Sequence, residues 1–310
     1  MKKKCLKIFL ISSIIICALL STFSFSFAIG QEKTTGETVS QEASDYLEMA
    51  INKMEEAIDT YQGANYPNKE LWVQAIEYGE KAVKADPDFI EAHYYLAQIY
   101  QYTNWYYREA REWERYIELI QKKKVISPEA QKKLAFAYYR LGYAAYQRED
   151  YDGCILYLQK AIEIDPKIIK AHYWLGRVFY EIGRLNDSLS SWQKVLEIDP
   201  YYPRAQYFYT KVENSIKYGK EAYSHYEAGY NSYEQKLYEK AIYEYRQAVR
   251  YNPNFSSAYY WLGRIYYERG NYQEAANNWR EVLRLEPDNK KAEYWLKEAE
   301  KNKNNQNWIE

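Results

Sequence analysis

Few side chains in this chain have the types and spacing that catalysis or metal binding requires. Its three histidines, candidate metal ligands or general bases, are dispersed at His93, His172 and His225. Cys154 is a candidate nucleophile. The sequence contains no glycine-rich phosphate loop, no Gly-x-Ser-x-Gly turn and no His-Glu-x-x-His motif. We therefore expect no catalytic residues, no cofactor and no metal site, and we expect that the protein is not an enzyme.

The residues named above lie in amphipathic stretches of the chain, which are separated by short breaks. Most of the breaks contain a proline, and the residue before a proline is pushed out of helical geometry. No stretch shows the sustained alternation of apolar and polar residues that is typical of a half-buried strand. The sequence therefore predicts an all-helical chain, with breaks at Asp86-Pro87, Ser127-Pro128, Asp165-Pro166, Asp199-Pro200, Asn252-Pro253 and Glu286-Pro287.

Two stretches of the chain are near copies of each other. Residues 171–183 read Ala-His-Tyr-Trp-Leu-Gly-Arg-Val-Phe-Tyr-Glu-Ile-Gly, and residues 258–270 read Ala-Tyr-Tyr-Trp-Leu-Gly-Arg-Ile-Tyr-Tyr-Glu-Arg-Gly. The intervals from Pro166 to Pro200 and from Pro253 to Pro287 are both 34 residues. Helical repeats of this length stack on one another, because a single helix pair cannot bury its own apolar face.

Residues 135–289 closely resemble the tetratricopeptide repeat family. A small residue in the family pattern lets the two helices of a pair approach, and large aromatic residues fill the space between pairs. The resemblance implies an all-α fold, a right-handed superhelical solenoid of antiparallel helix pairs with extra capping helices, in a secreted or membrane-anchored bacterial-type protein. The unit 256–289 carries the pattern at Leu262, Gly263, Tyr266, Ala275, Trp279, Val282 and Pro287, and the units 135–168, 169–202 and 222–255 carry it at equivalent positions.

The sequence also repeats over a longer interval than 34 residues. An offset of 87 residues places 171–183 on 258–270, and an offset of 79 places 75–96 on 154–175. The chain therefore resembles three copies of a two-repeat module, with an extra helix after each of the last two copies. The middle extra helix either continues the superhelix or breaks it. The predicted organisation is a signal peptide or uncleaved anchor at 1–28, a flexible linker at 29–42, two degenerate repeats at 43–131 with an enlarged loop around 63–67, two repeats at 135–202, an extra helix at 203–221, two repeats at 222–289, a capping helix at 290–301 and a disordered tail at 302–310.

The amino-terminal 28 residues have the form of a secretory signal. Four lysines precede a mostly apolar run at 8–27, and Ser26-Phe27-Ala28 offers a cleavage point after Ala28. We expect an extracytoplasmic protein, which is secreted, periplasmic or anchored to the cell membrane by this segment alone. Removing the segment changes 42 basic and 43 acidic residues to 38 and 43, a net charge of −5. We therefore expect no nucleic-acid partner.

Their positions in the repeats give the histidines and Cys154 structural roles. Each histidine falls at the fourth position of a first helix, and equivalent positions on neighbouring repeats are separated by at least about 8–10 Å, too far to share one metal at about 2 Å. Cys154 occupies the small-residue position of the pattern, so we expect it to be buried. It is also the one cysteine that remains after signal removal, so no internal disulfide is expected.

Tyrosine is the unusual feature of the composition, with 38 residues. Positions 5, 9 and 12 of the first helices lie about one turn apart, on the face that lines the concave side in this family. Position 9 alternates between tyrosine and arginine, and the two arginines either contact a ligand or pair with Glu181 and Glu268, four residues on. The predicted partner-binding residues are Tyr94, Tyr139, Tyr143, Tyr146, Tyr173, Arg177, Tyr180, Tyr226, Tyr230, Tyr233, Tyr260, Arg264 and Tyr267.

The leading functional hypothesis is a non-catalytic scaffold that binds a protein or peptide of the cell envelope in its concave groove. The family's clamp for a terminal carboxylate, Lys at position 5 with Asn at position 9, is replaced here by Tyr with Tyr or Arg. The alternative is a module that binds cell-envelope glycans on exposed Tyr and Trp rings. A third hypothesis is a structural protein that self-associates through its degenerate repeats.

Overall fold

The computed structural model describes residues 38–61 and 68–306. Over these residues the chain forms fourteen α-helices, and it divides into two compact units, Met1–Lys124 and Val125–Glu310. None of the helices in the described part has the length and apolarity needed to cross a membrane. The predicted signal segment and the predicted loop around 63–67 fall outside the described residues.

The first unit contains two helix pairs. Within each pair the helices pack against each other, and α2 also packs against α3. Large aromatic side chains fill the pairs: Trp72 and Trp113 are completely or almost completely buried. The helices are α1 (Gln41–Tyr61), α2 (Glu70–Ala85), α3 (Ile90–Tyr102) and α4 (Tyr106–Gln121).

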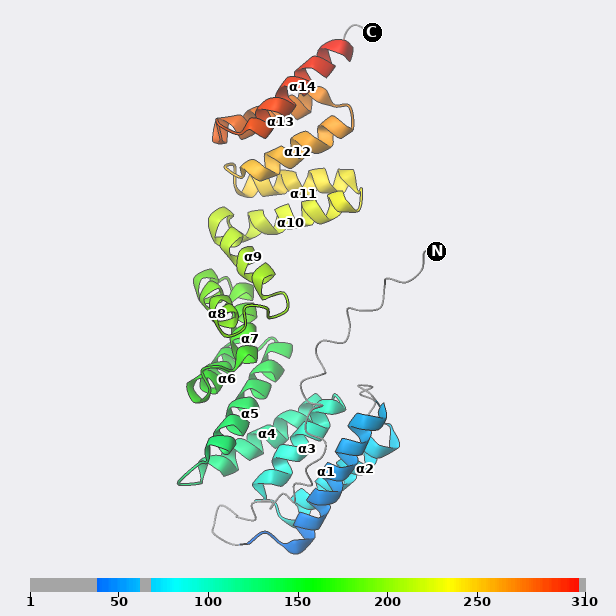
Figure 1. Cartoon of the computed structure of the whole chain (residues 1–310), viewed down its shortest axis with the longest axis vertical. Coiled ribbons are helices and arrows are strands. Elements are labelled where there is room, and N and C mark those ends of the chain that lie inside the picture. The colour runs from blue at the N-terminus through cyan, green and yellow to red at the C-terminus, as the bar shows by residue number, and fades with distance from the viewer. Residues whose placement is uncertain (1–37, 62–67, 307–310) are drawn as a thin grey trace. The chain divides into compact units, whose positions relative to one another are not determined.

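The second unit contains ten helices, which follow one another in chain order (Figure 1). Neighbouring helices pack through apolar side chains, with Trp192 and Trp279 at the centres of two buried clusters. The helices are α5 (Pro128–Gln147), α6 (Tyr151–Ile164), α7 (Ile169–Glu181), α8 (Leu185–Ile198), α9 (Ala205–Tyr218), α10 (Lys220–Glu234), α11 (Tyr238–Tyr251), α12 (Ser256–Glu268), α13 (Tyr272–Leu285) and α14 (Lys290–Gln306).

An Asp or Asn before a proline ends several helices. The side chain of Asp165 accepts a hydrogen bond from the backbone N–H of Lys167 at 3.0 Å, and Asn252 accepts from Asn254 at 2.9 Å. This local hydrogen bond stabilises a turn and competes with continuation of the helix. The following proline has no backbone N–H to donate to a helical carbonyl. The predicted breaks at these prolines are confirmed, because α6 ends at Ile164 and α11 ends at Tyr251.

Glycine allows close packing within two of the helix pairs. A Cβ atom at Gly176 of α7 would lie 2.7 Å from the indole of Trp192 in α8, and one at Gly263 of α12 would lie 2.7 Å from that of Trp279 in α13. Both rings are almost completely buried. The ring of the partner helix therefore packs directly against the glycine at the small-residue position of the repeat, as the sequence pattern predicts.

The helix α9 has no second helix of its own. It packs against α8 on one side and α10 on the other, and Gly219, with φ of 91°, joins it directly to α10. Lys211 of α9 forms an ion pair with Glu227 of α10 at 2.6 Å. The alternation of first and second helices is thus interrupted at Gly219, and five helices, α5–α9, precede five equivalent ones, α10–α14.

The helix bounds correct three predicted boundaries. The helix α1 begins at Gln41, inside the predicted linker 29–42. The helix α5 begins at Pro128, so the last residues of the segment 43–131 belong to it; the hydroxyl of Ser127 accepts from the N–H of Ala130 at 3.2 Å and fixes this start. The helix α14 continues to Gln306, so residues 302–306, predicted as tail, are helical.

Candidate functional site

The first helices of the second unit carry most of the predicted binding residues. Side chains three or four positions apart lie on one face of a helix, so each of these helices presents its three predicted residues together. Between them the structure places tryptophan and phenylalanine rings from the same or the following helices. The predicted residues are Tyr139, Tyr143 and Tyr146 on α5; Tyr173, Arg177 and Tyr180 on α7; Tyr226, Tyr230 and Tyr233 on α10; and Tyr260, Arg264 and Tyr267 on α12.

The first aromatic cluster is formed by Tyr143, Tyr146, Trp174, Arg177 and Phe208. Trp174 lies at its centre, with its ring centroid 4.8 Å from each of the two tyrosine rings of α5. The guanidinium carbon of Arg177 lies 5.7 Å from the Trp174 ring and 5.3 Å from the ring of Phe208 on α9. Three consecutive first helices thus contribute to one aromatic surface around a cation.

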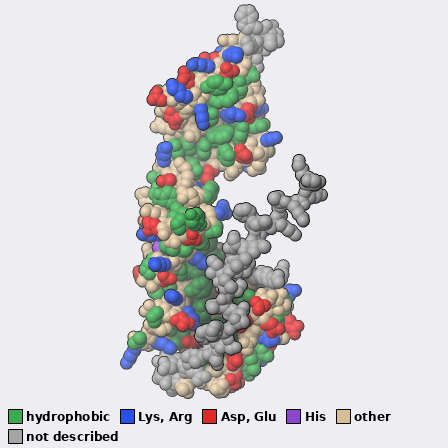
Figure 2. All heavy atoms as spheres, viewed as in Figure 1, with side chains coloured by type: hydrophobic (Ala, Val, Ile, Leu, Met, Phe, Trp, Pro, Cys, Tyr) green, Lys and Arg blue, Asp and Glu red, His purple; other side chains and the backbone are tan. Residues whose placement is uncertain are grey.

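The second aromatic cluster repeats this arrangement 87 residues later, with Tyr230, Tyr233, Trp261, Arg264 and Trp295. The Trp261 ring lies 5.5 Å from Tyr230 and 4.9 Å from Tyr233. The guanidinium carbon of Arg264 lies 5.3 Å from the ring of Trp295 on α14. Figure 2 shows hydrophobic side chains gathered over the part of the molecule where α10–α14 lie, among acidic and basic ones.

The two arginines have different partners. Arg264 Nε donates to Glu268 Oε1 at 2.6 Å, and the hydroxyl of Tyr233 donates to the same oxygen at 2.9 Å. Arg177 donates to the hydroxyl of Tyr146 in a long bond of 3.5 Å, and among the described residues it forms no ion pair with Glu181. Local pairing with a glutamate four residues on is therefore confirmed at Arg264 and wrong at Arg177.

Two of the predicted binding residues differ from the others in burial or in location. Tyr139 is only 6% exposed, and burial raises the pKa of its hydroxyl, so it is part of the core beneath the first cluster. Tyr94 lies on α3 in the other unit, where its ring contacts Trp113 and Tyr116 at 5.5 Å each. Both residues are at position 5 of their repeats, where only Tyr139 is a core residue. The other tyrosines at this position are partly buried: Tyr94, Tyr173, Tyr226 and Tyr260.

Four aromatic residues of the clusters were missed by the sequence analysis. They are Trp174, Trp261, Phe208 and Trp295. A signal for them was present, because the 87-residue offset places Trp174 on Trp261 and Phe208 on Trp295. The same offset relates the hydrogen bond between Tyr180 and Ser215, at 3.2 Å, to the one between Tyr267 and Asn302, at 2.8 Å.

The histidines bond to groups on the paired helix or in the preceding turn. His93 Nδ1 lies 2.6 Å from Glu112 Oε2, and His225 Nδ1 lies 2.7 Å from Glu244 Oε2. His172 Nε2 lies 3.0 Å from the carbonyl oxygen of Pro166. Each ring therefore ties a helix to its neighbour or to the preceding turn, which agrees with the packing role predicted for it.

Other chemical groups of the described residues offer little reactivity. Cys154 is completely buried, and burial raises the pKa of its thiol to about 12. No group of three or more His, Cys, Asp or Glu in the described part is arranged to hold a metal ion. A shallow hollow of ≈ 440 Å³ lies between α8 and α9, where Leu189 and Ile216 line it, away from the face of α9 that carries Phe208.

Comparison with known proteins gives three matches to family models. Two models described as "Tetratricopeptide repeat" match residues 256–289 and 135–168, and one described as "TPR repeat" matches residues 229–268. No curated protein matches the chain.

Several solved structures are similar in fold. The MamA protein is 18% identical, with 68% of this chain and 96% of that chain covered and a TM-score of 0.47. The pilF protein of Pseudomonas aeruginosa is 14% identical, with coverages of 83% and 98% and a TM-score of 0.40. YrrB, described as a TPR protein with an unusual peptide-binding site, is 16% identical, with coverages of 77% and 95% and a TM-score of 0.34. The family matches support the tetratricopeptide repeat family for this chain, whose fold is an all-α array of tetratricopeptide repeats.

Proposed function

We propose that this chain is a non-catalytic, extracytoplasmic scaffold that binds a protein or peptide partner of the cell envelope through its two aromatic clusters. The observation that carries the proposal is the repeated surface itself: tyrosine, tryptophan and arginine, the residue types that dominate protein interfaces, meet twice on consecutive first helices. Phenol and guanidinium groups there stack on side chains and donate hydrogen bonds to an extended backbone.

The glycan alternative has less support from the geometry. Sugar rings stack on open aromatic faces, but Trp174 and Trp261 are partly buried and contact three and four tyrosine rings, respectively. Among the described residues, the most exposed tyrosines are Tyr107 and Tyr201, which are 84% and 92% exposed and lie outside the clusters. The geometry therefore favours a protein or peptide partner, and the experiment below also tests for polysaccharide binding.

The test is affinity capture from a cell-envelope extract of the native host. A variant with Tyr143→Ala, Arg177→Ala, Tyr230→Ala and Arg264→Ala removes two side chains from each cluster. A control variant with Tyr201→Ala, Tyr243→Ala, Arg148→Ala and Arg250→Ala removes the same residue types from exposed positions elsewhere. We expect the wild type and the control to retain the same partner and the cluster variant, folded by circular dichroism, to retain about tenfold less of it.

Other outcomes would contradict the proposal in distinct ways. Equal retention by all three proteins would mean that the clusters do not bind the partner. Binding of purified envelope polysaccharide by the wild type alone, with no retained protein, would favour the glycan alternative. Concentration-dependent association of the wild type without any partner would favour self-assembly.

The extracytoplasmic part of the proposal depends on residues 1–28 and has its own test. Expression of the full chain in a bacterial host should place it outside the cytoplasm, and amino-terminal sequencing of the product should begin at Ile29 if the segment is cleaved. A protein that remains in the cytoplasmic fraction with Met1 intact would refute the proposed location and leave the binding proposal untouched.

A further inference from the structure

The two aromatic clusters share a framework but differ in charge. At the 87-residue offset, Lys170 corresponds to Ser257, Arg140 to Glu227 and Lys211 to Glu298, whereas the central arginines are retained. Two of these pairs reverse the sign of the charge and one removes a cation. Because Lys211 is paired with Glu227, the remaining difference is that Lys170 and Arg140 lie beside the first cluster where the equivalent positions are Ser257 and Glu227.

Two guanidinium groups lie near the ring of Phe208 in the first cluster. The guanidinium carbons of Arg177 and Arg204 are each 5.3 Å from its ring centroid. Among the described residues, neither arginine forms an ion pair with a carboxylate. Arg177 is also partly buried, so its charge has lost part of its hydration, and Glu181 acts on it only from beyond ion-pair distance. A ligand carboxylate at this point would supply the missing partner.

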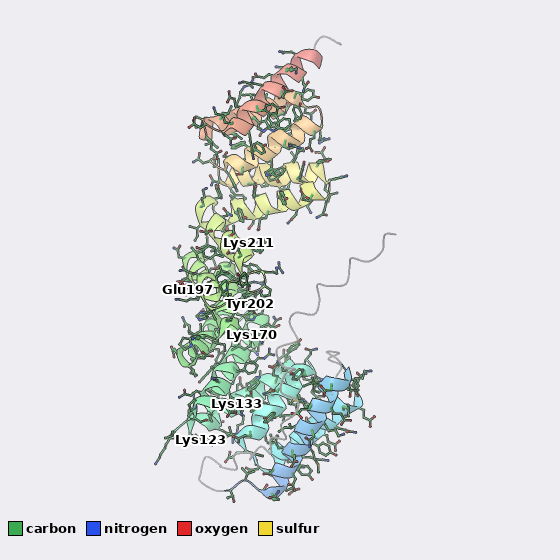
Figure 3. The ribbon with its side chains drawn as sticks, viewed as in Figure 1. Lys123, Lys133, Lys170, Glu197, Tyr202 and Lys211 are labelled. Atoms are coloured by element: carbon green, nitrogen blue, oxygen red, sulfur yellow. The ribbon has the colours of Figure 1, made fainter. Side chains whose placement is uncertain are left out.

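Lys170 adds a third cation next to the first cluster. Its ammonium nitrogen lies 5.7 Å from the ring of Tyr139, over which the guanidinium of Arg140 also lies, at 5.9 Å. Partial loss of water around the ammonium, together with the charge of Arg140, lowers the pKa of Lys170. Figure 3 labels Lys170, at the start of α7, and Tyr202, in the turn before α9.

In the part of the chain that the structure describes, the acidic groups near the first cluster form no ion pair with Arg177. Glu181, at the end of α7, is exposed and is not bonded to Arg177. Glu227 of α10 is engaged by Lys211 at 2.6 Å and by the hydroxyl of Tyr207 at 3.0 Å. In the second cluster, by contrast, Glu268 binds the arginine directly.

We infer that the first aromatic cluster is the subsite for an acidic segment of the peptide partner, whereas the second cluster receives a neutral, apolar or aromatic segment of the same partner. This inference rests on the proposed peptide-binding function, and it adds the orientation of the bound peptide and the side-chain chemistry that each cluster recognises. A guanidinium held between aromatic rings is preorganised to bind a carboxylate in charge-assisted hydrogen bonds. Arg264 is already neutralised by Glu268 and has no such vacancy for an anion.

A peptide fits this pattern better than a nucleic acid. A phosphate backbone needs basic groups along its whole path, and the charge reversal at the second cluster interrupts such a path. A peptide can place acidic residues at one cluster and apolar residues at the other. The observed asymmetry therefore favours a partner whose own charge is asymmetric.

The first step of the test is selection of random displayed peptides on the full chain. The recovered peptides should be enriched in Asp and Glu over one half of their length. The best peptide is then synthesised with a fluorescent label, both as recovered and with Asp and Glu replaced by Asn and Gln. Fluorescence anisotropy should give an affinity about tenfold higher for the acidic form, and this preference should decrease as salt rises.

Variants then locate the acidic subsite. Arg177→Gln should reduce the tenfold preference to about twofold or less, whereas Arg177→Lys, which keeps the charge, should retain part of it. Arg264→Gln, the matched change in the second cluster, should weaken both forms of the peptide equally and leave the preference intact. Arg250→Gln, at an exposed position outside the clusters, should change neither affinity. Circular dichroism checks that each variant is folded.

The outcomes separate this inference from the proposed function. Recovered peptides without acidic enrichment, or an unchanged preference in Arg177→Gln, would overturn the acidic subsite while leaving peptide binding in place. Failure to recover any peptide would overturn peptide binding itself, and the subsite with it. Tighter binding of a single-stranded DNA oligonucleotide than of any recovered peptide would also overturn the inference.

Discussion

The close approach of Gly263 to Trp279 gives a stability prediction with a definite sign. A Cβ atom at Gly263 would lie 2.7 Å from Nε1 and 2.8 Å from Cε2 of the buried indole. Forcing such an atom into a packed core costs about 1–3 kcal/mol. Replacing glycine by alanine inside a helix stabilises the helix by about 0.5–1 kcal/mol. We therefore expect Gly263→Ala to lower the free energy of unfolding by about 1 kcal/mol, taking the middle of both ranges.

A second background isolates the steric cause. Trp279→Val removes the indole atoms that a new Cβ would meet, so in that background Gly263→Ala should raise the free energy of unfolding by about 0.5 kcal/mol through helix propensity alone. Trp279→Val also removes a buried indole N–H that has no hydrogen-bond partner among the described residues, which offsets part of the cost of losing the ring.

Urea unfolding followed by circular dichroism measures all four proteins of this cycle. The four proteins are compared by the midpoints of their urea transitions, provided that the m-value is the same in all of them. A changed m-value would show that neighbouring repeats no longer unfold together. A loss of stability of the same size in both backgrounds would refute the steric explanation for glycine at this position. A gain in the wild-type background would show that α12 and α13 are packed less closely than described.

Three further predictions concern a cap, a joint and the buried thiol. Asp150→Ala removes the acceptor of the Gly153 N–H at the start of α6, a bond of 3.0 Å, and should lower the free energy of unfolding by about 1 kcal/mol in urea titration, with Asp152→Ala as a control of similar charge change. Gly219→Ala places a side chain at φ of 91° between α9 and α10 and should cost about 1–2 kcal/mol by the same assay; no change would mean that this joint relaxes freely. Burial raises the pKa of Cys154 from 9.0 to about 12, so the fold holds the neutral thiol and this contribution is complete below pH 9 and lost as pH rises toward 12. The stability of the wild type relative to Cys154→Ala should fall across that range, and a constant difference would contradict the burial of the thiol.

The repeat pattern predicts the elements of this fold well because several local signals agree. Asp or Asn before proline, a small residue in the first helix and a ring in the second occur at fixed spacing, and each acts within one helix pair. The boundaries at α1, α5 and α14 were less accurate, since they depend on capping groups such as Ser127 and on how far an amphipathic face extends. No local pattern marks the last turn of an end helix.

The candidate site was predictable in its framework and not in its detail. Spacing alone places Tyr143, Arg177, Tyr230 and Arg264 on one type of helix face. Spacing does not show whether an arginine pairs along its own helix or turns toward a ring of the next one. Arg264 has both Glu268 and Trp295 within reach and contacts both, whereas the guanidinium of Arg177 lies beside Trp174 and Phe208.

The ion pair between Lys211 and Glu227 has a consequence for the growth of the array. It joins the last helix of one five-helix module to the first helix of the next. At the end of the second module the position of Lys211 is taken by Glu298 on α14. A further module, or another copy of the chain, docked there as α10 docks on α9 would bring Glu227 against Glu298, two like charges at a contact that otherwise attracts. The change from lysine to glutamate at this position therefore disfavours docking of a further module on α14.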